Sequence, residues 1–329
     1  MRILVTGGTG YIGSHTVVEL LNNGHEVVIV DNLSNSGLEI LDKIKEITGV
    51  KPEFYAYDLR DKKRLEWVFQ NHKFDAVIHF AGFKAVGESM INPLEYYNNN
   101  LISTIYLLEL MNLYEVNKIV FSSSATVYGL AEYEMLVEEN ISNPVNTYAA
   151  TKSNIENMLY FTSLANKNLK VSVLRYFNPI GAHKSGLIGD APTGFPNNLL
   201  PFIGDVAVGK RDKLYVFGND YDTPDGTGVR DYIHVIDLAI AHIKALESDI
   251  EGYNVFNIGT GEGTSVLQII NAFEKATGIK IPYEITDRRP GDVPVYIANP
   301  EKANTILNWK AIYNIEDMCA DYWNYKKNN

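Results

Sequence analysis

Residues 5–13 read VTGGTGYIG and connect an apolar run at residues 3–5 to a helical pattern that begins near residue 16. The order strand, glycine-rich loop and helix predicts a tight turn that brings backbone N–H groups and a helix N-terminus close to a pyrophosphate. Two glycine patterns fit the loop, G-x-G-x-x-G from Gly8, Gly10 and Gly13, and G-x-x-G-x-x-G from Gly7, Gly10 and Gly13. Because glycines also mark ordinary turns, this interpretation depends on the segments that follow.

The second predicted strand, residues 25–30, ends at Asp31. A carboxylate at this position can accept hydrogen bonds from an adenosine ribose. No Arg or Lys follows before Lys43, so a 2′-phosphate would meet the negative charge of Asp31 without a basic partner nearby. The pattern therefore favours NAD over NADP, and the alternative is that Asp31 merely ends a strand.

The composition limits the classes of protein and partner. With 329 residues, of which 46% are hydrophobic, the chain is long enough for one large domain and a smaller lobe. A net charge of -11 and the lack of basic runs argue against nucleic acid as a partner. No apolar stretch approaches a membrane span, and the single Cys319 excludes an internal disulfide, so we expect a cytoplasmic protein without a membrane partner. The seven His residues lack metal-ligand spacing, so we predict no metal site.

Strands and helices are predicted to alternate through the first half of the chain. Further strands are expected at residues 53–57, 74–80 and 118–121, with helices at residues 38–47, 62–71, 93–114 and 147–165. This rhythm predicts a doubly wound, Rossmann-type parallel sheet over residues 1–178 and a smaller C-terminal α/β lobe over residues 179–329, from which some segments can return to the first domain. Ligands of such sheets bind at the carboxyl ends of the strands, where the small pair Ala81 and Gly82 leaves room for a cofactor.

The helix at residues 147–165 carries Tyr148 and Lys152, which lie one turn apart on the same face. This spacing also fits an ordinary amphipathic helix. Together with Ser124, which follows the fifth strand, the pair forms a proton-transfer set for alcohol and ketone chemistry. Tyrosine has an ordinary pKa of about 10, and the charges of Lys152 and of an oxidised nicotinamide would stabilise the phenolate.

Several motifs resemble the extended short-chain dehydrogenase/reductase superfamily and, within it, the UDP-glucose 4-epimerase family. They are residues 7–15 (GGTGYIGSH), 80–89 (FAGFKAVGES), 122–129 (SSSATVYG), 175–178 (RYFN), 217–221 (FGNDY), 225–234 (DGTGVRDYIH) and 288–292 (RRPGD). They span nearly the whole chain in the family's order. This resemblance, and not the residue spacing, implies that the substrate is a UDP-sugar.

The resemblance also implies site residues. Tyr148 would be the base, with Ser124 and Lys152 as its partners. Residues implied around NAD are Gly7, Gly10, Tyr11, Ile12, Gly13, Asp31, Asn32, Asp58, Leu59, Phe80, Ala81, Gly82, Lys84, Asn99, Ser122, Tyr148, Lys152 and Phe177. Residues implied around the UDP-sugar are Ser124, Tyr148, Asn178, Asn198, Leu199, Phe217, Arg230, Arg289, Asp292 and Tyr296.

The types of the UDP-sugar residues suit their implied roles. Arg230 and Arg289 can neutralise a diphosphate, Asp292 can accept hydrogen bonds from ribose hydroxyls, and Phe217 can stack near uracil. By the resemblance, Tyr296 faces the sugar pocket opposite the nicotinamide, where a bulky residue leaves little room for an N-acetyl group. Taken as single residues, the arginines could equally be surface charges and Tyr296 a packed aromatic.

The implied activity is the reversible epimerisation of UDP-glucose and UDP-galactose at C4, through a 4-keto intermediate, in galactose metabolism. Two alternatives are another extended short-chain sugar-nucleotide oxidoreductase or 4,6-dehydratase, and a non-catalytic NAD-sensing protein. Dehydratases of the superfamily typically have acidic residues after the position of Ser124, where this chain has Ala125 and Thr126. A sensing protein would usually lack the Tyr148 and Lys152 pair.

The resemblance further implies a homodimer built on the helices at residues 93–114 and 147–165. Apolar residues that could provide its surface are Leu101, Ile105, Leu108, Met111, Ile155, Leu159 and Phe161. The same residues could instead belong to the core of a single chain.

Overall fold

The computed structural model describes residues 1–130, 135–191, 198–289 and 291–329, and the chain divides into two compact units. The first unit comprises residues 1–129, 141–175 and 239–256, and the second comprises residues 130–140, 176–238 and 257–329. Residues 130–140 thus group with the later part of the chain and residues 239–256 with the earlier part, whereas the boundary predicted at residue 178 stays a prediction. In the described part of the chain, no helix combines the length and the apolar character that crossing a membrane requires.

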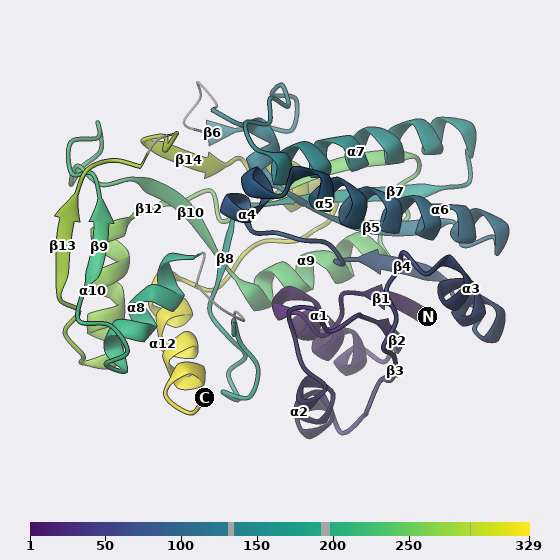
Figure 1. The fold of residues 1–329 in the computed structure, drawn as a ribbon, viewed down its shortest axis with the longest axis horizontal. Coiled ribbons are helices and arrows are strands. Elements are labelled where there is room, and N and C mark those ends of the chain that lie inside the picture. The colour runs from purple at the N-terminus through teal and green to yellow at the C-terminus, as the bar shows by residue number, and fades with distance from the viewer. Residues whose placement is uncertain (131–134, 192–197, 290) are drawn as a thin grey trace. The chain divides into compact units, whose positions relative to one another are not determined.

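The first unit is built on a seven-stranded sheet with the order β11-β7-β5-β4-β1-β2-β3 (Figure 1). Its strands are β1 (Arg2–Thr6), β2 (Glu26–Val30), β3 (Glu53–Tyr55), β4 (Ala76–His79), β5 (Lys118–Ser124), β7 (Lys170–Tyr176) and β11 (Tyr253–Ile258). The pairs β1–β2, β1–β4, β2–β3 and β4–β5 are parallel. The strand order reverses between β1 and β4, which is the switch point where doubly wound sheets bind ligands. The predicted α/β fold is confirmed.

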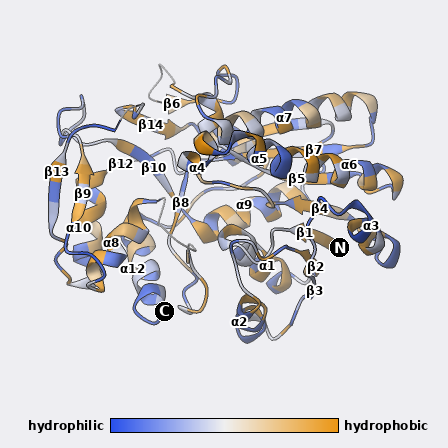
Figure 2. Cartoon of the chain, viewed as in Figure 1, coloured by the Kyte–Doolittle hydropathy of each residue, from blue (hydrophilic) through white to orange (hydrophobic). Residues whose placement is uncertain are grey.

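Helices cover both faces of this sheet. They are α1 (Tyr11–Asn22), α2 (Glu39–Thr48), α3 (Lys62–Asn71), α4 (Val86–Ile91), α5 (Pro93–Tyr97), α6 (Ser103–Leu113), α7 (Thr147–Ala165) and the later part of α9 (Val235–Glu247). Figure 1 shows α6 and α7 along one face and α1 and α2 on the other. The strands are mostly hydrophobic in Figure 2, as expected for a sheet that is buried on both faces, whereas α3 is largely hydrophilic.

The single helix predicted at residues 93–114 is interrupted. A π-helical segment, η1 (Asn98–Ile102), separates α5 from α6. The hydroxyls of Ser103 and Thr104 donate to the backbone carbonyls of Asn99 and Asn100, at 2.6 and 2.7 Å. Side-chain hydroxyls that bond carbonyls of the preceding turn disturb the regular helix ladder, and π-helical turns often occur at functional sites. The apolar periodicity of the sequence carries no sign of this interruption.

The second unit has a five-stranded sheet and a strand pair. In the sheet β12, β10, β14 and β6 lie in that order and β8 also pairs with β10, while β13 pairs with β9. The strands are β6 (Met135–Leu136), β8 (Asn178–Ile180), β9 (Leu214–Phe217), β10 (Val229–His234), β12 (Gly263–Ser265), β13 (Tyr283–Thr286) and β14 (Val295–Ala298). The helices α8 (Leu199–Ala207), α10 (Val266–Thr277), α11 (Glu301–Ile306) and α12 (Ile315–Lys326) accompany them. Residues of β9, α8, α10 and α12, such as Val216, Ile203, Phe273 and Tyr322, form its core.

Backbone geometry distinguishes between the two glycine patterns of the first loop. Gly7 has a φ of +71°, and a Cβ atom there would lie 2.7 Å from the backbone nitrogen of Ala81, which follows β4. A Cβ on Gly13 would lie 2.2 Å from the carbonyl oxygen of Gly7. Both positions therefore exclude a side chain, because backbone atoms cannot move aside as a flexible side chain can. Gly13 is common to both patterns, so the backbone contact at Gly7 is what supports the pattern of Gly7, Gly10 and Gly13; a Cβ on Gly8 would also lie 2.9 Å from an atom, but from the side chain of Ile29.

We predict that Gly7→Ala destabilises the protein more than Gly24→Ala does. Gly24 also has a positive φ, +77°, but no atom lies within 4 Å of its Cβ position. The control should lose about 1 to 2 kcal/mol from the left-handed backbone alone. Gly7→Ala should lose a further 1 to 3 kcal/mol or so from overpacking. Midpoints of thermal unfolding measure both changes, and equal shifts would contradict the close contact with Ala81.

Candidate active site

The glycine loop and the end of β2 are joined by backbone hydrogen bonds. The amide of Gly7 donates to the carbonyl of Val30, at 2.9 Å. The carboxylate of Asp31 accepts from the amide of Thr9 at 3.1 Å and from the amide of Leu33 at 2.9 Å. A carboxylate has about four acceptor positions, so Asp31 keeps capacity for a ligand hydroxyl. The structure thus places Asp31 beside the loop, as its predicted role requires.

Asn32 and Asp58 also meet, although 26 residues separate them. The side-chain amide of Asn32 donates to Asp58 at 3.2 Å. Arg60 donates to both oxygens of Asp58, at 3.0 and 2.8 Å, and these bonds lower the pKa of Asp58 to about 2. Asp58 is therefore ionised at neutral pH. Arg60, which the sequence analysis did not single out, also donates to Asn98 of η1 at 2.9 Å.

The segment after β4 is held by a residue that the sequence analysis missed. The side chain of Asn100, in η1, accepts from the amide of Phe83 at 2.8 Å and donates to its carbonyl at 3.1 Å. Its amide group also donates to the hydroxyl of Thr151 on α7, at 2.9 Å. Asn100 is buried and thus fixes the segment between Gly82 and Lys84 next to the helix that carries Tyr148. The only sequence signal was its place in a run of three asparagines.

Ser124, Tyr148 and Lys152, the predicted catalytic residues, come together where β5 ends against α7. Asn146 caps α7 by accepting from the amide of Ala149 at 2.8 Å, which fixes the turn that carries Tyr148. The side chain of Ser124 lies close enough to Tyr148 to lower the pKa of its phenol. The ammonium of Lys152 is buried, donates to the carbonyl of Ser122 at 2.7 Å and lies 5.9 Å from the centre of the Tyr148 ring.

Burial dominates the electrostatics of these residues. It lowers the pKa of Lys152 to about 8, and the nearby charge of Glu156 acts in the opposite direction. Burial also raises the pKa of Tyr148, while the nearby side chain of Ser124 lowers it. His79 of β4, buried between the hydroxyls of Thr6 and Thr104, has its pKa lowered to about 3 by burial and is neutral. At neutral pH this part of the unit therefore carries the Lys152 cation beside a phenol.

The second unit contains a cavity of about 240 Å³ at the start of α8 and along β9 and β10. Of the residues predicted for the UDP-sugar, it is lined by Asn178, Asn198, Leu199, Phe217, Arg230, Arg289 and Asp292. Tyr296 does not line this cavity. It is 9% exposed and packs against Phe177, with 5.8 Å between the ring centres. This contact agrees with a packed aromatic and leaves its implied role at the sugar a prediction.

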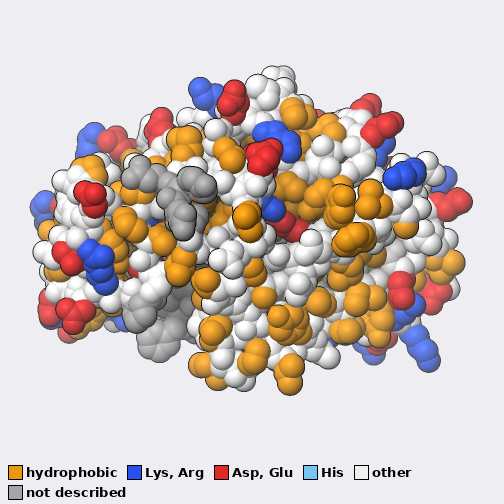
Figure 3. Space-filling model, turned by 90° about the horizontal axis from the view of Figure 1, so that it is seen from above, with side chains coloured by type: hydrophobic (Ala, Val, Ile, Leu, Met, Phe, Trp, Pro, Cys, Tyr) orange, Lys and Arg blue, Asp and Glu red, His pale blue; other side chains and the backbone are white. Residues whose placement is uncertain are grey.

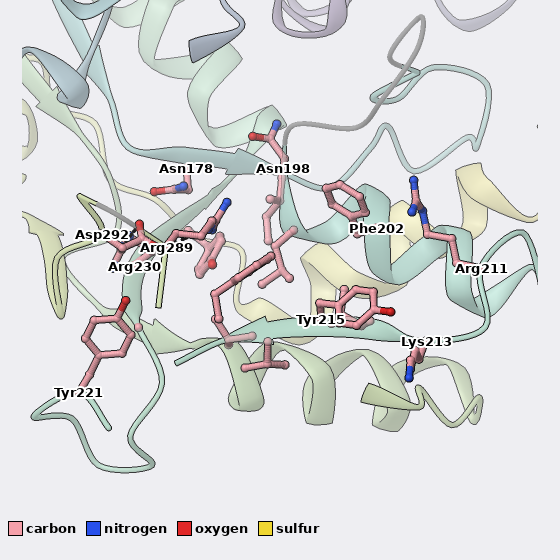
Figure 4. A pocket seen from close by; sticks show the side chains of 18 of the residues that line it. Asn178, Asn198, Phe202, Arg211, Lys213, Tyr215, Tyr221, Arg230, Arg289 and Asp292 are labelled. Atoms are coloured by element: carbon pink, nitrogen blue, oxygen red, sulfur yellow. Dashed lines mark hydrogen bonds and ion pairs between the residues drawn. The ribbon is translucent and has the colours of Figure 1, made fainter. Parts of the chain in front are cut away.

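Two arginines and one carboxylate meet at one end of this cavity (Figure 4). Arg230 donates to one oxygen of Asp292 at 3.1 Å, and Arg289 lies 3.3 Å from the other. The guanidinium of Arg289 also lies 4.7 Å from the centre of the Phe217 ring. The two cations exceed the single carboxylate by one positive charge, and planar guanidinium groups suit phosphate oxygens. This end of the cavity can therefore hold an anionic group.

The cavity also has lining residues that sequence reasoning missed. They include Phe202, Arg211, Lys213, Tyr215 and Tyr221. Figure 4 shows Arg211 and Lys213 at the end opposite Arg230 and Arg289. The guanidinium of Arg211 lies 4.9 Å from the centre of the Phe202 ring. Tyr221 belongs to the FGNDY motif, but nothing in the sequence pattern indicated that α8 and β9 would face one cavity.

Comparison with known proteins gives consistent results over the whole chain. The family described as GDP-mannose 4,6 dehydratase matches residues 4–322. UDP-glucose 4-epimerase of Bacillus subtilis (strain 168) is 54% identical over 331 residues, covering 100% of this chain and 98% of the relative. A UDP-glucose-4-epimerase structure from Stenotrophomonas maltophila, with bound NAD and formylated UDP-arabinopyranose, has a TM-score of 0.98 at 46% identity, over 100% and 98% of the two chains. One from Bifidobacterium longum, in complex with NAD+ and UDP, has a TM-score of 0.95 at 49% identity, over 100% and 99%.

The fold and its two groups of polar residues define an α/β protein of the Rossmann type with a Ser-Tyr-Lys set in one unit and, in the other, a cavity with two arginines at one end. Within this class, the chain belongs to the UDP-glucose 4-epimerase family.

Proposed function

We propose that this protein catalyses the NAD-dependent, reversible epimerisation of UDP-glucose and UDP-galactose at C4, through a 4-keto intermediate, and so serves galactose metabolism. The main support is the meeting of Ser124, Tyr148 and Lys152 at the end of β5. The names of the relatives support the substrate, and the structures with NAD and with UDP or a UDP-sugar support the ligands.

The first unit fits NAD. Side chains are excluded at Gly7 and Gly13, so the loop leaves its backbone open to a pyrophosphate at the start of α1. Asp31 is positioned beside the loop for a ribose hydroxyl. We assign the NAD contacts to the loop, to the ends of β2 and β4, and to the segment that Asn100 holds. When bound there, NAD supplies the hydride acceptor and donor for C4 of the sugar.

The residues of this chain would then move the proton. Tyr148 removes it from the C4 hydroxyl and later returns it, while Ser124 orients the sugar oxygen by a hydrogen bond. Lys152 stabilises the phenolate by its charge, because burial alone keeps the pKa of Tyr148 high. The reaction returns the hydride to the opposite face of C4, so it causes no net oxidation.

The second unit would hold the nucleotide. Arg230 and Arg289 would bind the diphosphate, and Phe217 and Leu199 would offer apolar surface to the base, which their common place in the cavity lining supports. A sugar that must present both faces of C4 needs few fixed contacts of its own. Numerous contacts to UDP and few to the hexose therefore suit epimerisation.

No observation specifically supports either alternative, a sugar-nucleotide oxidoreductase or 4,6-dehydratase, or a non-catalytic NAD-sensing protein. Although the matching family is described as a dehydratase, Ser124 is followed by Ala125 and Thr126 in η2 (Ala125–Tyr128). The hydroxyl of Thr126 donates to Ser124 at 2.9 Å, so a neutral group occupies the place of an acid. A non-catalytic NAD sensor would not need a buried Lys152 beside Tyr148.

We propose a cytoplasmic location on the basis of cysteine chemistry. Cys319, the one cysteine of the sequence, is free and buried. Burial raises the pKa of its thiol to about 12, so the thiol is neutral and unreactive at neutral pH. A chain that uses no disulfide suits a reducing compartment.

The central prediction is that the purified protein converts UDP-galactose to UDP-glucose without added NAD. Tyr148→Phe should keep the fold and the NAD content but reduce the rate by about 10² to 10⁴-fold, because the positioned base is lost. Chromatography of the sugar nucleotides measures the conversion, and mass spectrometry of the product tests whether the sugar has lost water.

Tyr160→Phe is the matched control, because Tyr160 lies on the same helix and is 42% exposed. Its rate should equal that of the unmodified protein. A product lighter by one water would indicate a dehydratase, and undiminished activity of Tyr148→Phe would refute the role of this tyrosine.

A second prediction concerns Tyr296 as the residue that limits which sugars enter. We expect a preference for UDP-galactose over UDP-N-acetylgalactosamine, and Tyr296→Ser should reduce that preference about tenfold to a hundredfold, because overpacking costs about 1 to 3 kcal/mol. The ratio of kcat/KM for the two sugars measures it. An unchanged ratio would show that Tyr296 does not limit which sugars enter and that it only packs against Phe177.

We also propose a homodimer formed by α4 to α7, with a revised set of surface residues. Leu108, Met111, Ile155 and Leu159 are at most 8% exposed and pack in the core of their own unit, so they cannot provide the surface expected from the sequence. Exposed apolar side chains on these helices are instead Met90, Ile91, Leu94, Leu113, Phe161 and Leu164. Figure 3 looks onto the side of the first unit where these helices lie and shows hydrophobic side chains gathered there.

Replacing two of these residues should dissociate the dimer. Leu94 and Phe161 are 81% and 66% exposed, and charges buried between two copies would oppose association. We predict a dimer of the 36.9 kDa chain by light scattering at micromolar concentration, and a monomer for Leu94→Arg/Phe161→Arg. Ile312→Arg, at a 74% exposed position of the second unit, should stay dimeric. A monomeric unmodified protein would reject the proposal.

A further inference from the structure

The end of β5 and one face of α7 meet through three successive contacts. Tyr148, Lys152 and Glu156 follow one another at every fourth residue and so share that face. Their contacts are the approach of Ser124 to Tyr148, the hydrogen bond of 2.7 Å from Lys152 to the carbonyl of Ser122, and the hydrogen bond of 2.5 Å from the hydroxyl of Ser123 to Glu156. The proposed reaction uses the first two contacts and leaves Glu156 without a role.

Glu156 belongs to a buried ion pair. Arg175 of β7 donates to its two carboxylate oxygens at 3.1 and 2.7 Å. The two side chains are only 8% and 6% exposed, and the guanidinium of Arg175 lies 4.7 Å from the centre of the Tyr128 ring. One carboxylate therefore connects α7 to β5 and to β7.

Stability alone does not account for this pair. Removing two charges from water costs several kcal/mol per ion, and apolar side chains of similar volume often give an equally stable or a more stable protein. Apolar side chains could fill the space between α7 and the sheet, but they would supply neither the acceptor for Ser123 nor a negative charge near Lys152. Both features act on residues of the proposed proton transfer.

The charge of Glu156 opposes the effect of burial on Lys152. Burial lowers the pKa of Lys152, and Glu156 raises it. In the described part of the chain, the other ionisable groups around this position include Tyr148 on α7, neutral His79 on β4 and Arg175 on β7 and, beyond the ion pair, Tyr128 in η2 and Tyr253 on β11. Glu156 is thus the carboxylate whose charge opposes the loss of the Lys152 proton.

We propose that Glu156 is a positioning residue for proton transfer, which holds Ser123 and the end of β5 against α7 and maintains the charge of Lys152. This inference rests on the proposed epimerisation. Glu156 itself makes and breaks no covalent bond. Its carboxylate fixes the distance between Ser124 and Tyr148 through the neighbouring Ser123, and its charge supports the cation that stabilises the phenolate.

Two variants separate the geometric part from the electrostatic part. Ser123→Ala removes the hydrogen bond and leaves the carboxylate, so kcat for UDP-galactose should fall while the alkaline limb of its pH profile stays in place. Glu156→Gln/Arg175→Gln removes both buried charges and leaves a neutral amide at each position. Its alkaline limb should move to lower pH by on the order of one unit, because Lys152 then loses its proton more easily.

KM and a control variant distinguish this role from a structural one. The nucleotide cavity lies in the second unit, so KM for UDP-galactose should change less than about twofold in both variants while kcat falls about tenfold or more. Ser163→Ala is the control, because Ser163 is a buried serine of α7 that donates only to the carbonyl of Tyr160 at 2.7 Å. It should leave kcat and the pH profile unchanged.

Melting temperature and NAD content, measured on each variant, complete the test. If the unmodified protein does not convert UDP-galactose, the proposed function and this inference both fail. If the unmodified protein converts UDP-galactose, two results together would show that this inference alone is wrong. They are full kcat for Ser123→Ala and an alkaline limb that does not move in Glu156→Gln/Arg175→Gln. A kcat that falls only in proportion to the folded fraction would also overturn it. Should the double variant fail to fold, Ser123→Ala still decides, because it leaves the ion pair intact.

Discussion

The buried ammonium of Lys152 is the constraint on which the first unit depends. An ammonium removed from water needs hydrogen-bond acceptors and a nearby negative charge, and the protein supplies the carbonyl of Ser122 and the carboxylate of Glu156. These partners come from β5 and from the next turn of α7, and Glu156 is itself held by Arg175 of β7. The partners of one buried charge thus connect the helix to two strands.

The second unit meets a different electrostatic condition. Arg230 and Arg289 would repel each other near one end of the cavity, and Asp292 reduces this repulsion by contacting both. The expected role of Asp292 was to accept from ribose hydroxyls. Its oxygens contact the two guanidinium groups, and because a carboxylate has further acceptor positions, the expected role stays a prediction. One carboxylate therefore pairs with both cations, which are the groups proposed to bind the diphosphate.

The division of polar groups between the units suits a reaction in which the nucleotide is fixed and the sugar is not. The first unit contains the groups proposed to move a proton, and the second contains the cations and apolar surface proposed to bind UDP. Whether such a site catalyses epimerisation or dehydration depends on the residues next to Ser124. Ala125 and Thr126 place no acid next to Ser124, which favours epimerisation over the dehydration named in the description of the matching family.

The sequence by itself determined the features that are local in the chain, namely the glycine loop, Asp31 at the end of β2 and the spacing of Tyr148 and Lys152, because periodicity and turn chemistry act between near neighbours. Its resemblance to a family added the cavity residues. Only the tertiary structure decided the features that depend on distant atoms. They are the close approach of Gly7 to Ala81, the hydrogen bonds between Asn100 and Phe83, and the ion pair of Glu156 with Arg175. They also include the position of Phe202 and Arg211 in the lining of the cavity and the burial of Leu108 and Met111 in the core. Burial, ion pairing and the pKa of Lys152 arise from segments that meet only after folding, so no local pattern records them.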